Sequence, residues 1–138
     1  NSNECGYALI MSTEIIGLSH LEREIIANVV RYNIRDFDYD MMQLETEAGQ
    51  DLAGVSDRTA ITILIAKLTA ILRLANSMDK THKSKLIDCR MAVREGQLVI
   101  TTGYKGDLAL ESASFEQKAA FFEEIFGIRP VLKQKRRV

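Results

Sequence analysis

One long helix with almost no polar side is the strongest constraint that this sequence places on the fold. Residues 57–78 carry apolar side chains at the helical spacing i, i+3, i+4, at Ile61, Leu64, Ile65, Leu68, Ile71, Leu72 and Ala75. A second apolar stripe is formed by Ile63, Ala70 and Leu74. Such a helix is normally buried centrally, so we expect further N-terminal helices, or a second copy of the chain, to cover what its neighbours leave open.

Length, charge and cysteine content narrow the class of protein. The chain has 138 residues, enough for one domain, and its net charge of -1 means that any attraction to phosphate must come from local clustering. The apolar run 60–66 ends at Lys67, well short of the roughly 20 residues of a membrane span. Two cysteines without metal-like spacing favour reduced thiols. We therefore expect a soluble cytoplasmic protein with no membrane contact.

The first part of the chain reads as helical. A brief helical pattern covers residues 7–11, and a second helix begins at Ser19, where Glu22 completes a capping box. Residues 34–55 are acidic and irregular, which predicts a long loop with a short helix in it. Ser56 is positioned to cap the long helix. Residues 1–84 thus form a helical part.

The second part, residues 85–138, changes from a period of 3.6 to a period of 2. Ile87 to Arg94 alternates apolar and polar residues, Glu95-Gly96 predicts a tight turn, and "QLVITT" predicts the returning strand. "DLALE" (107–111) is expected to form a third strand, and Ser114 with Gln117 to cap a helix that ends at Gly127. "IRPVLKQK" is expected to form the last strand. We predict an α+β chain whose small antiparallel sheet has one packing helix, in the order β-β-β-α-β.

Two basic clusters are the candidate sites. One closes the long helix and consists of Lys80, His82, Lys83 and Lys85. The other lies near the C-terminus and consists of Arg129, Lys133, Lys135, Arg136 and Arg137. Cations at a helix C-terminus can simply complement its dipole, and a basic tail can simply aid solubility. The functional alternative is contact with a phosphate polymer, and because no aromatic residue lies within either cluster, nucleic-acid bases are a less suitable ligand.

The residues needed for catalysis do not come together in the sequence. His20 and His82 lie in different predicted elements, and neither belongs to an HxxxH, HxxE or HD pair, so we expect no metal ligands. Cys89 falls on the apolar face of its strand and reads as an inert core thiol. A glycine-rich phosphate loop of the GxxxxGK type is also missing from the sequence. We expect no catalytic residues and no cofactor in this chain.

Several stretches resemble one family in the same order. "YALIMSTEIIGLSHLEREIIANVVRYN", "IAKLTAILRLANSMDKTHKSKL", "LVITTGYKGDLALE" and "KAAFFEEIFGIRPVL" resemble the C-terminal region of the exopolyphosphatase / guanosine pentaphosphate phosphohydrolase (Ppx/GppA) family. The most specific portion is ILRLA-x-x-x-D-x-x-H, in which Arg73, Asp79 and His82 stand where the family has them. Asn33 and Cys5 replace family histidines, which argues against a metal role for this part.

The resemblance implies more than the residues show by themselves. It implies a cytoplasmic phosphohydrolase whose actin-like N-terminal catalytic domains, with their Mg²⁺, lie outside this chain. This chain would then be an HD-like helical domain, incomplete at its N-terminus, with the small α+β part at its end. The family's C-terminal region helps to form a homodimer and a basic channel for inorganic polyphosphate, guanosine pentaphosphate being the other family substrate. On this basis the expected substrate contacts are Arg73, Lys80, His82, Lys83, Lys85, Lys133, Lys135 and Arg136.

Other interpretations of the same residues stay open. Arg73 and Asp79 would form a structural ion pair capped by His82 if the helix end had no ligand. The chain would be a degenerate HD-like regulatory or interaction module if its basic tail bound RNA or a protein. A purely structural end domain is the third alternative. All three share the expectation that the chain has no catalytic activity of its own.

Overall fold

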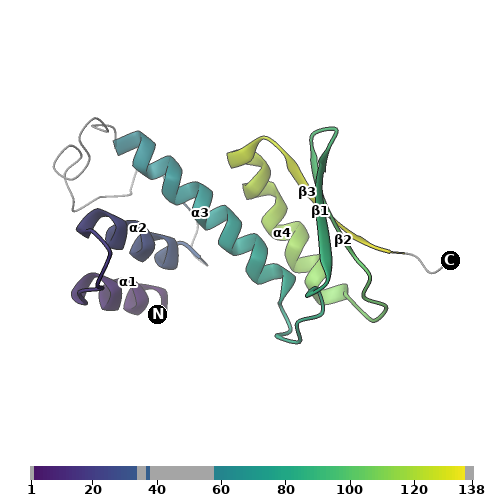
Figure 1. Cartoon of the computed structure of the whole chain (residues 1–138), viewed down its shortest axis with the longest axis horizontal. Coiled ribbons are helices and arrows are strands. Elements are labelled where there is room, and N and C mark those ends of the chain that lie inside the picture. Colours follow the sequence, from purple (N-terminus) through teal and green to yellow (C-terminus); the bar gives the residue numbers. More distant parts are fainter. Residues whose placement is uncertain (1, 34–36, 38–57, 136–138) are drawn as a thin grey trace. The chain divides into compact units, whose positions relative to one another are not determined.

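The computed structural model describes residues 2–33, 37 and 58–135 of the chain. Its elements follow the order α1, α2, α3, β1, β2, α4, β3 (Figure 1). The chain divides into an N-terminal unit, Asn1–Thr69, and a C-terminal unit, Ala70–Val138. The boundary falls within α3 (Arg58–Met78), so each unit contains one half of this helix. The mixed α+β class expected from the sequence is confirmed.

The N-terminal unit contains α1 (Ser2–Ser12), α2 (His20–Arg31) and the first half of α3. The predicted capping box is confirmed, because the Ser19 hydroxyl accepts from the Glu22 backbone N–H and the Glu22 carboxylate accepts from the Ser19 N–H. The first helix extends over 11 residues, longer than the predicted 7–11. The predicted loop at 34–55 and the Ser56 cap lie outside the described residues, apart from Phe37.

Two kinds of contact hold α1 against α2. A Cβ at Gly6 would lie 2.7 Å from Val30 Cγ1, so only glycine allows the two helices to approach this closely here. The Arg31 guanidinium lies 3.4 Å from the centroid of the Tyr7 ring and 3.2 Å from Glu4 Oε1. The core of this unit is formed by Leu21, Ile61 and Ile65, with Ile25, Val29 and Phe37 around it.

The C-terminal unit is a three-stranded sheet with one helix against it. β1 (Cys89–Arg94) and β2 (Gln97–Thr102) form an antiparallel hairpin, and β3 (Arg129–Gln134) pairs with the other side of β2 in parallel. Because α4 (Ala109–Phe126) connects β2 to β3, the third strand can return in the same direction. Its core contains Ala70, Leu74, Ile100, Phe115 and Phe122, which places the second half of α3 with the sheet.

The prediction of a strand at "DLALE" is wrong, because Ala109–Glu111 begin α4 and Asp107 and Leu108 directly precede it. The order is therefore β-β-α-β, and the sheet is mixed rather than antiparallel. Leu108 and Glu111 are buried whereas Ala109 and Leu110 are exposed, which is a helical pattern and not an alternating one. The Asp107 carboxylate accepts from the Ala109 N–H at 2.8 Å and turns the chain into the helix.

The predicted capping box at Ser114 and Gln117 is also wrong. Ser114 lies inside α4 and is buried in the core of the unit, so it does not begin the helix. The end of this helix was predicted correctly, since Gly127 takes the left-handed conformation with φ 73° and its N–H donates to the Glu123 carbonyl. Glycine is the residue that adopts this conformation without steric cost.

The long helix α3 keeps an uncovered apolar stripe. Leu64, Leu68 and Ile71, at spacing i, i+4 and i+7, are 43%, 38% and 50% exposed. By length and composition alone, Thr59–Met78 is a helix that could cross a membrane. Its buried residues Ile61, Ile65, Ala70 and Leu74 belong to the cores of the two units. Within the described residues α3 therefore keeps apolar surface open, and its covering by further helices or by a second copy stays a prediction.

Candidate functional site

Asp79 accepts two hydrogen bonds that hold the loop following α3 in place. The Asp79 carboxylate accepts from the Ser84 N–H at 3.0 Å, and the Asp79 carbonyl accepts from the His82 N–H at 3.0 Å. His82 and Ser84 both take positive φ, at 56° and 51°, which non-glycine residues adopt only when their surroundings hold them there. The sequence motif MDKTHKSK therefore forms a defined loop, which we call the cation loop (residues 79–85).

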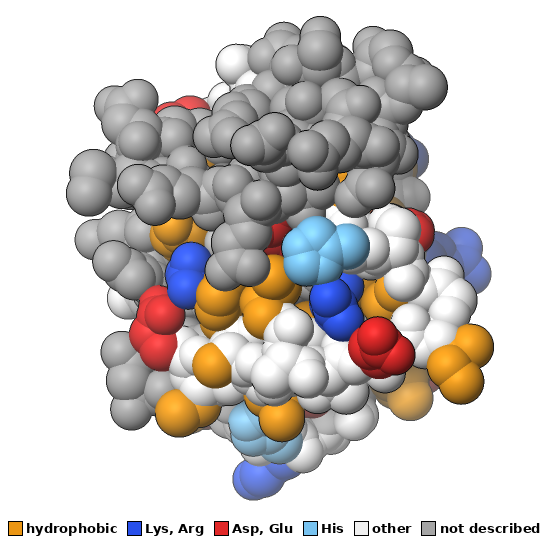
Figure 2. All heavy atoms as spheres, turned by 90° about the vertical axis from the view of Figure 1, so that its left-hand side faces the viewer, with side chains coloured by type: hydrophobic (Ala, Val, Ile, Leu, Met, Phe, Trp, Pro, Cys, Tyr) orange, Lys and Arg blue, Asp and Glu red, His pale blue; other side chains and the backbone are white. Residues whose placement is uncertain are grey.

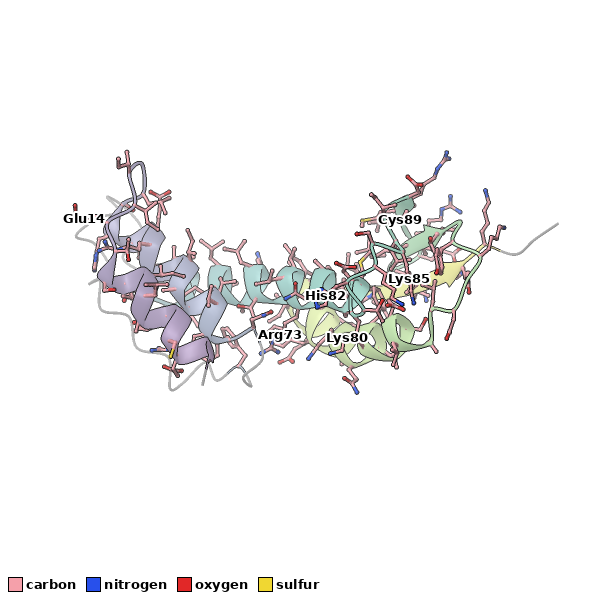
Figure 3. The ribbon with its side chains drawn as sticks, turned by 90° about the horizontal axis from the view of Figure 1, so that it is seen from below. Glu14, Arg73, Lys80, His82, Lys85 and Cys89 are labelled. Atoms are coloured by element: carbon pink, nitrogen blue, oxygen red, sulfur yellow. The ribbon has the colours of Figure 1, made fainter. Side chains whose placement is uncertain are left out.

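Three of the basic side chains in this loop face solvent. Lys80, His82 and Lys83 are exposed, and neither lysine forms an ion pair with any described residue. His82 Nδ1 lies 3.9 Å from Asp79 Oδ2, and the His82 side chain is 89% exposed. Figure 3 shows Lys80 and His82 around the C-terminal end of α3. The ammonium groups of Lys80 and Lys83 are therefore available to an external anion.

Lys85 has a different environment from the other cations of the loop. Its Nζ donates to the Asp107 carbonyl at 2.9 Å and lies 3.3 Å from Glu111 Oε1, with the two side chains 14% and 1% exposed. The Thr81 hydroxyl donates to Glu111 Oε2 at 2.7 Å. This buried network ties the cation loop to the beginning of α4. Because its ammonium is already paired, Lys85 is better explained as a structural residue than as a ligand contact.

The pKa of Glu111 is lowered from its ordinary value of 4.5 by these partners. The largest cause is the hydrogen bond that the Thr81 hydroxyl donates to the carboxylate, and the hydrogen bond and charge of Lys85 act in the same direction. Burial of the carboxylate opposes this shift. Glu111 was not among the residues predicted from the sequence, where it read as part of a strand.

Arg73 packs against an aromatic ring. Its guanidinium carbon lies 4.8 Å from the centroid of the Phe121 ring, a cation–π distance between α3 and α4 within the C-terminal unit. The ring of Phe121 is thus one contact of Arg73, and the ion pair of Arg73 with Asp79 stays a prediction. The Asp79 carboxylate contacts Ser84 and His82.

The basic residues of the C-terminal cluster differ in whether they form ion pairs. Arg129 is held by Glu116 and Glu123 of α4, at 3.2 Å and 3.4 Å, and so contributes little free charge. Lys133 lies on β3 opposite Thr101, and both Lys133 and Lys135 are exposed. The predicted contact Arg136 lies outside the described residues. Lys133 and Lys135 remain candidates for anion contact.

A hollow in the N-terminal unit has a different character. It has a volume of about 320 Å³ and is lined by Glu14, Ile15, Ile16, Leu18, His20 and Arg23. Arg23 Nη1 donates to the Thr13 carbonyl at 2.8 Å, and Nη2 lies 2.8 Å from His20 Nδ1, so these polar groups fasten the loop between α1 and α2. Figure 2, which views the molecule from the side of this unit, shows hydrophobic side chains mixed with both signs of charge rather than a basic surface.

The chain was compared with protein-family models and with curated protein sequences. Neither a protein-family model nor a curated protein sequence matches the chain. Within the described residues, no three His, Cys, Asp or Glu side chains are arranged to hold a metal ion. The family resemblance therefore rests on the motifs quoted above, and the function is argued from the cation loop.

Proposed function

We propose that this chain is a non-catalytic C-terminal part of an exopolyphosphatase-like phosphohydrolase, and that it binds inorganic polyphosphate and contributes to a homodimer. The helical half would be the HD-like domain of such an enzyme. Its actin-like domains, with Mg²⁺, would carry out the hydrolysis of polyphosphate or guanosine pentaphosphate in the cytoplasm. The supporting motif is ILRLA-x-x-x-D-x-x-H, which ends in the cation loop.

The observation that carries the proposal is the separation of roles within the cation loop. Lys85 and Thr81 hold the loop through their contacts with the buried Glu111, and Asp79 holds it through its hydrogen bond from the Ser84 N–H. Lys80 and Lys83 are exposed and have no acidic partner among the described residues. A loop that served only to end α3 would not need to hold like charges together in a fixed conformation. Holding them so lowers the entropy cost of binding a chain of phosphates.

Binding of long-chain polyphosphate to the purified chain tests the proposal. We expect the double variant Lys80→Gln/Lys83→Gln to bind more weakly, and the slope of log affinity against log salt to fall by about 1.4, at roughly 0.7 for each lost phosphate contact. The matched control is Lys67→Gln/Lys105→Gln, which removes two exposed lysines elsewhere and should leave the slope unchanged. Equal effects of the two double variants would contradict a specific role for the loop.

A competition experiment separates this function from the alternative module. Polyphosphate should displace a labelled polyphosphate probe far better than an unstructured RNA of the same charge does. Stronger competition by RNA would favour an RNA-binding module that uses Lys133, Lys135 and the residues after them. We also expect the chain alone to release no phosphate above a Mg²⁺-free control, and a measurable rate would show that it carries catalytic groups of its own.

A further inference from the structure

The free edge of β1 is a surface that the proposed function does not use. The strand order is β1-β2-β3, so β1 has β2 on one side and no described strand on the other. β1 pairs with β2 without interruption from Cys89↔Thr102 to Arg94↔Gln97. Its backbone N–H and C=O groups on the outer side therefore form a straight row that can pair with another strand.

The two edges of the sheet differ in how they are protected. At the β3 edge, Pro130 has no N–H to offer, and the Gln134 amide donates to the Tyr104 and Gly106 carbonyls of a neighbouring loop. β1 contains neither proline nor a bulge, and its cations Arg90 and Arg94 lie on the sheet face away from the core. Natural proteins usually protect a free edge, and the two arginines are the one such device that β1 carries, so its backbone groups stay open to a pairing strand.

The core-side face of β1 is apolar and uncovered. Met91 is paired with Ile100, and Val93 with Leu98, so these side chains point to the face of the sheet that packs on α4. Ile100 is buried, but Met91 and Val93 are 59% and 65% exposed. Cys89, which Figure 3 labels at the start of the strand, is only partly covered. An added strand would cover this face as well as the free backbone groups.

The charges along β1 fit a second copy of the same strand. In an antiparallel pair with Met91 opposite Met91 of the second copy, Val93 faces Cys89 within the strands. Asp88, the residue directly before β1, then faces Arg94 on both sides of the two-fold axis. A shift that sets Ala92 opposite Ala92 would place Arg90 against Arg94 twice. A register centred on Cys89 would leave residues 91–94 opposite residues that precede the strand.

From this complementarity we propose that two copies of the chain join through β1 to form one continuous six-stranded sheet, in the register centred on Met91. The inference rests on the homodimer in the proposed function and adds the surface and the register. The pairing is isologous and closes at two chains. Apolar contact of Met91 and Val93, with two Asp88–Arg94 cross-strand pairs, then holds the two sheets together.

Charge exchange tests the register directly. Asp88→Arg alone and Arg94→Asp alone each set like charges opposite one another at both pairs, and we expect each to weaken dimerisation about ten-fold or more by sedimentation. The double variant Asp88→Arg/Arg94→Asp restores opposite charges and should dimerise like the wild type. A mixture of the two single variants should form heterodimers, because every pair is then again Arg with Asp.

A second substitution tests the centre of the interface. Met91→Lys places two ammonium groups against each other and should give monomers, whereas Leu110→Lys, at a similarly exposed apolar position on α4, should not. The proposal is overturned if the wild type is monomeric at micromolar concentration, or if the single charge variants dimerise like the wild type. Polyphosphate affinity of the same samples tests the proposed function separately, since Lys80 and Lys83 are intact in all of them.

Discussion

At the scale of single residues, Lys85 and Lys83 allow a direct comparison. Lys85→Met keeps the apolar stem but removes the ammonium from Glu111 and the Asp107 carbonyl, so we expect the melting temperature to fall by roughly 5–10 °C. Lys83→Met, at an exposed position without an ion pair among the described residues, should change it by less than about 2 °C. Thermal unfolding followed by circular dichroism measures both, and equal effects would show that the buried network adds no stability.

The pH dependence of stability follows from Glu111. Because its pKa in the folded chain lies below the ordinary 4.5, the ionised carboxylate stabilises the fold above pH 4.5, and this contribution is lost as the pH falls through the folded pKa. Glu111→Gln lacks this dependence. Urea unfolding between about pH 6 and about pH 3 should show the difference in stability between wild type and variant shrinking toward the acid end. A constant difference would contradict the lowered pKa.

The sequence could not predict which lysines of the cation loop are paired and which are exposed. Lys83 and Lys85 stand two positions apart in the same basic run, and their neighbours in sequence are alike. What separates them is Glu111, which lies 26 residues beyond Lys85. The location of the cations was therefore predictable, but which of them are paired depends on a tertiary contact that local pattern does not contain.

At the scale of elements, the capping box of α2 is the clearest local determinant. Ser19→Ala removes the acceptor for the Glu22 N–H, and we expect a loss of about 1 kcal/mol in unfolding free energy. Ser112→Ala, at an exposed interior position of α4, should be neutral or slightly stabilising, because alanine is the better helix former. Urea denaturation of both variants checks this, and a similar loss at Ser112 would mean that the effect is not one of capping.

Elements defined by strong local signals were predictable, and those decided by tertiary packing were not. Ser19, Gly127 and the Glu95-Gly96 turn mark boundaries by backbone chemistry, and the structure places each where the sequence predicted it. The segment 107–111 alternates like a strand, but burial of Leu108 and Glu111 against the rest of the C-terminal unit selects the helix. Five residues are too few for periodicity to distinguish the two.

At the scale of the whole molecule, the uncovered stripe of α3 and the free edge of β1 compete as the place for a second copy. Burial of the stripe would be worth about 25 cal/mol per Å² of apolar area, so either surface can support association. The sequence predicted the stripe, because helical periodicity is visible in it. The sequence did not indicate the free edge of β1. The crossover through α4 places β3 on the other side of β2 and so leaves β1 outermost.

Leu64→Lys/Leu68→Lys separates the two surfaces. If β1 forms the interface, this double variant should still sediment as a dimer at micromolar concentration, while binding of an apolar fluorescent dye falls because the stripe is now charged. Met91→Lys should behave in the opposite way, giving monomers that bind the dye at least as well as the wild type. Monomers from the α3 variant, with dimers from Met91→Lys, would place the second copy on α3, because charge is tolerated only at a surface that stays in water.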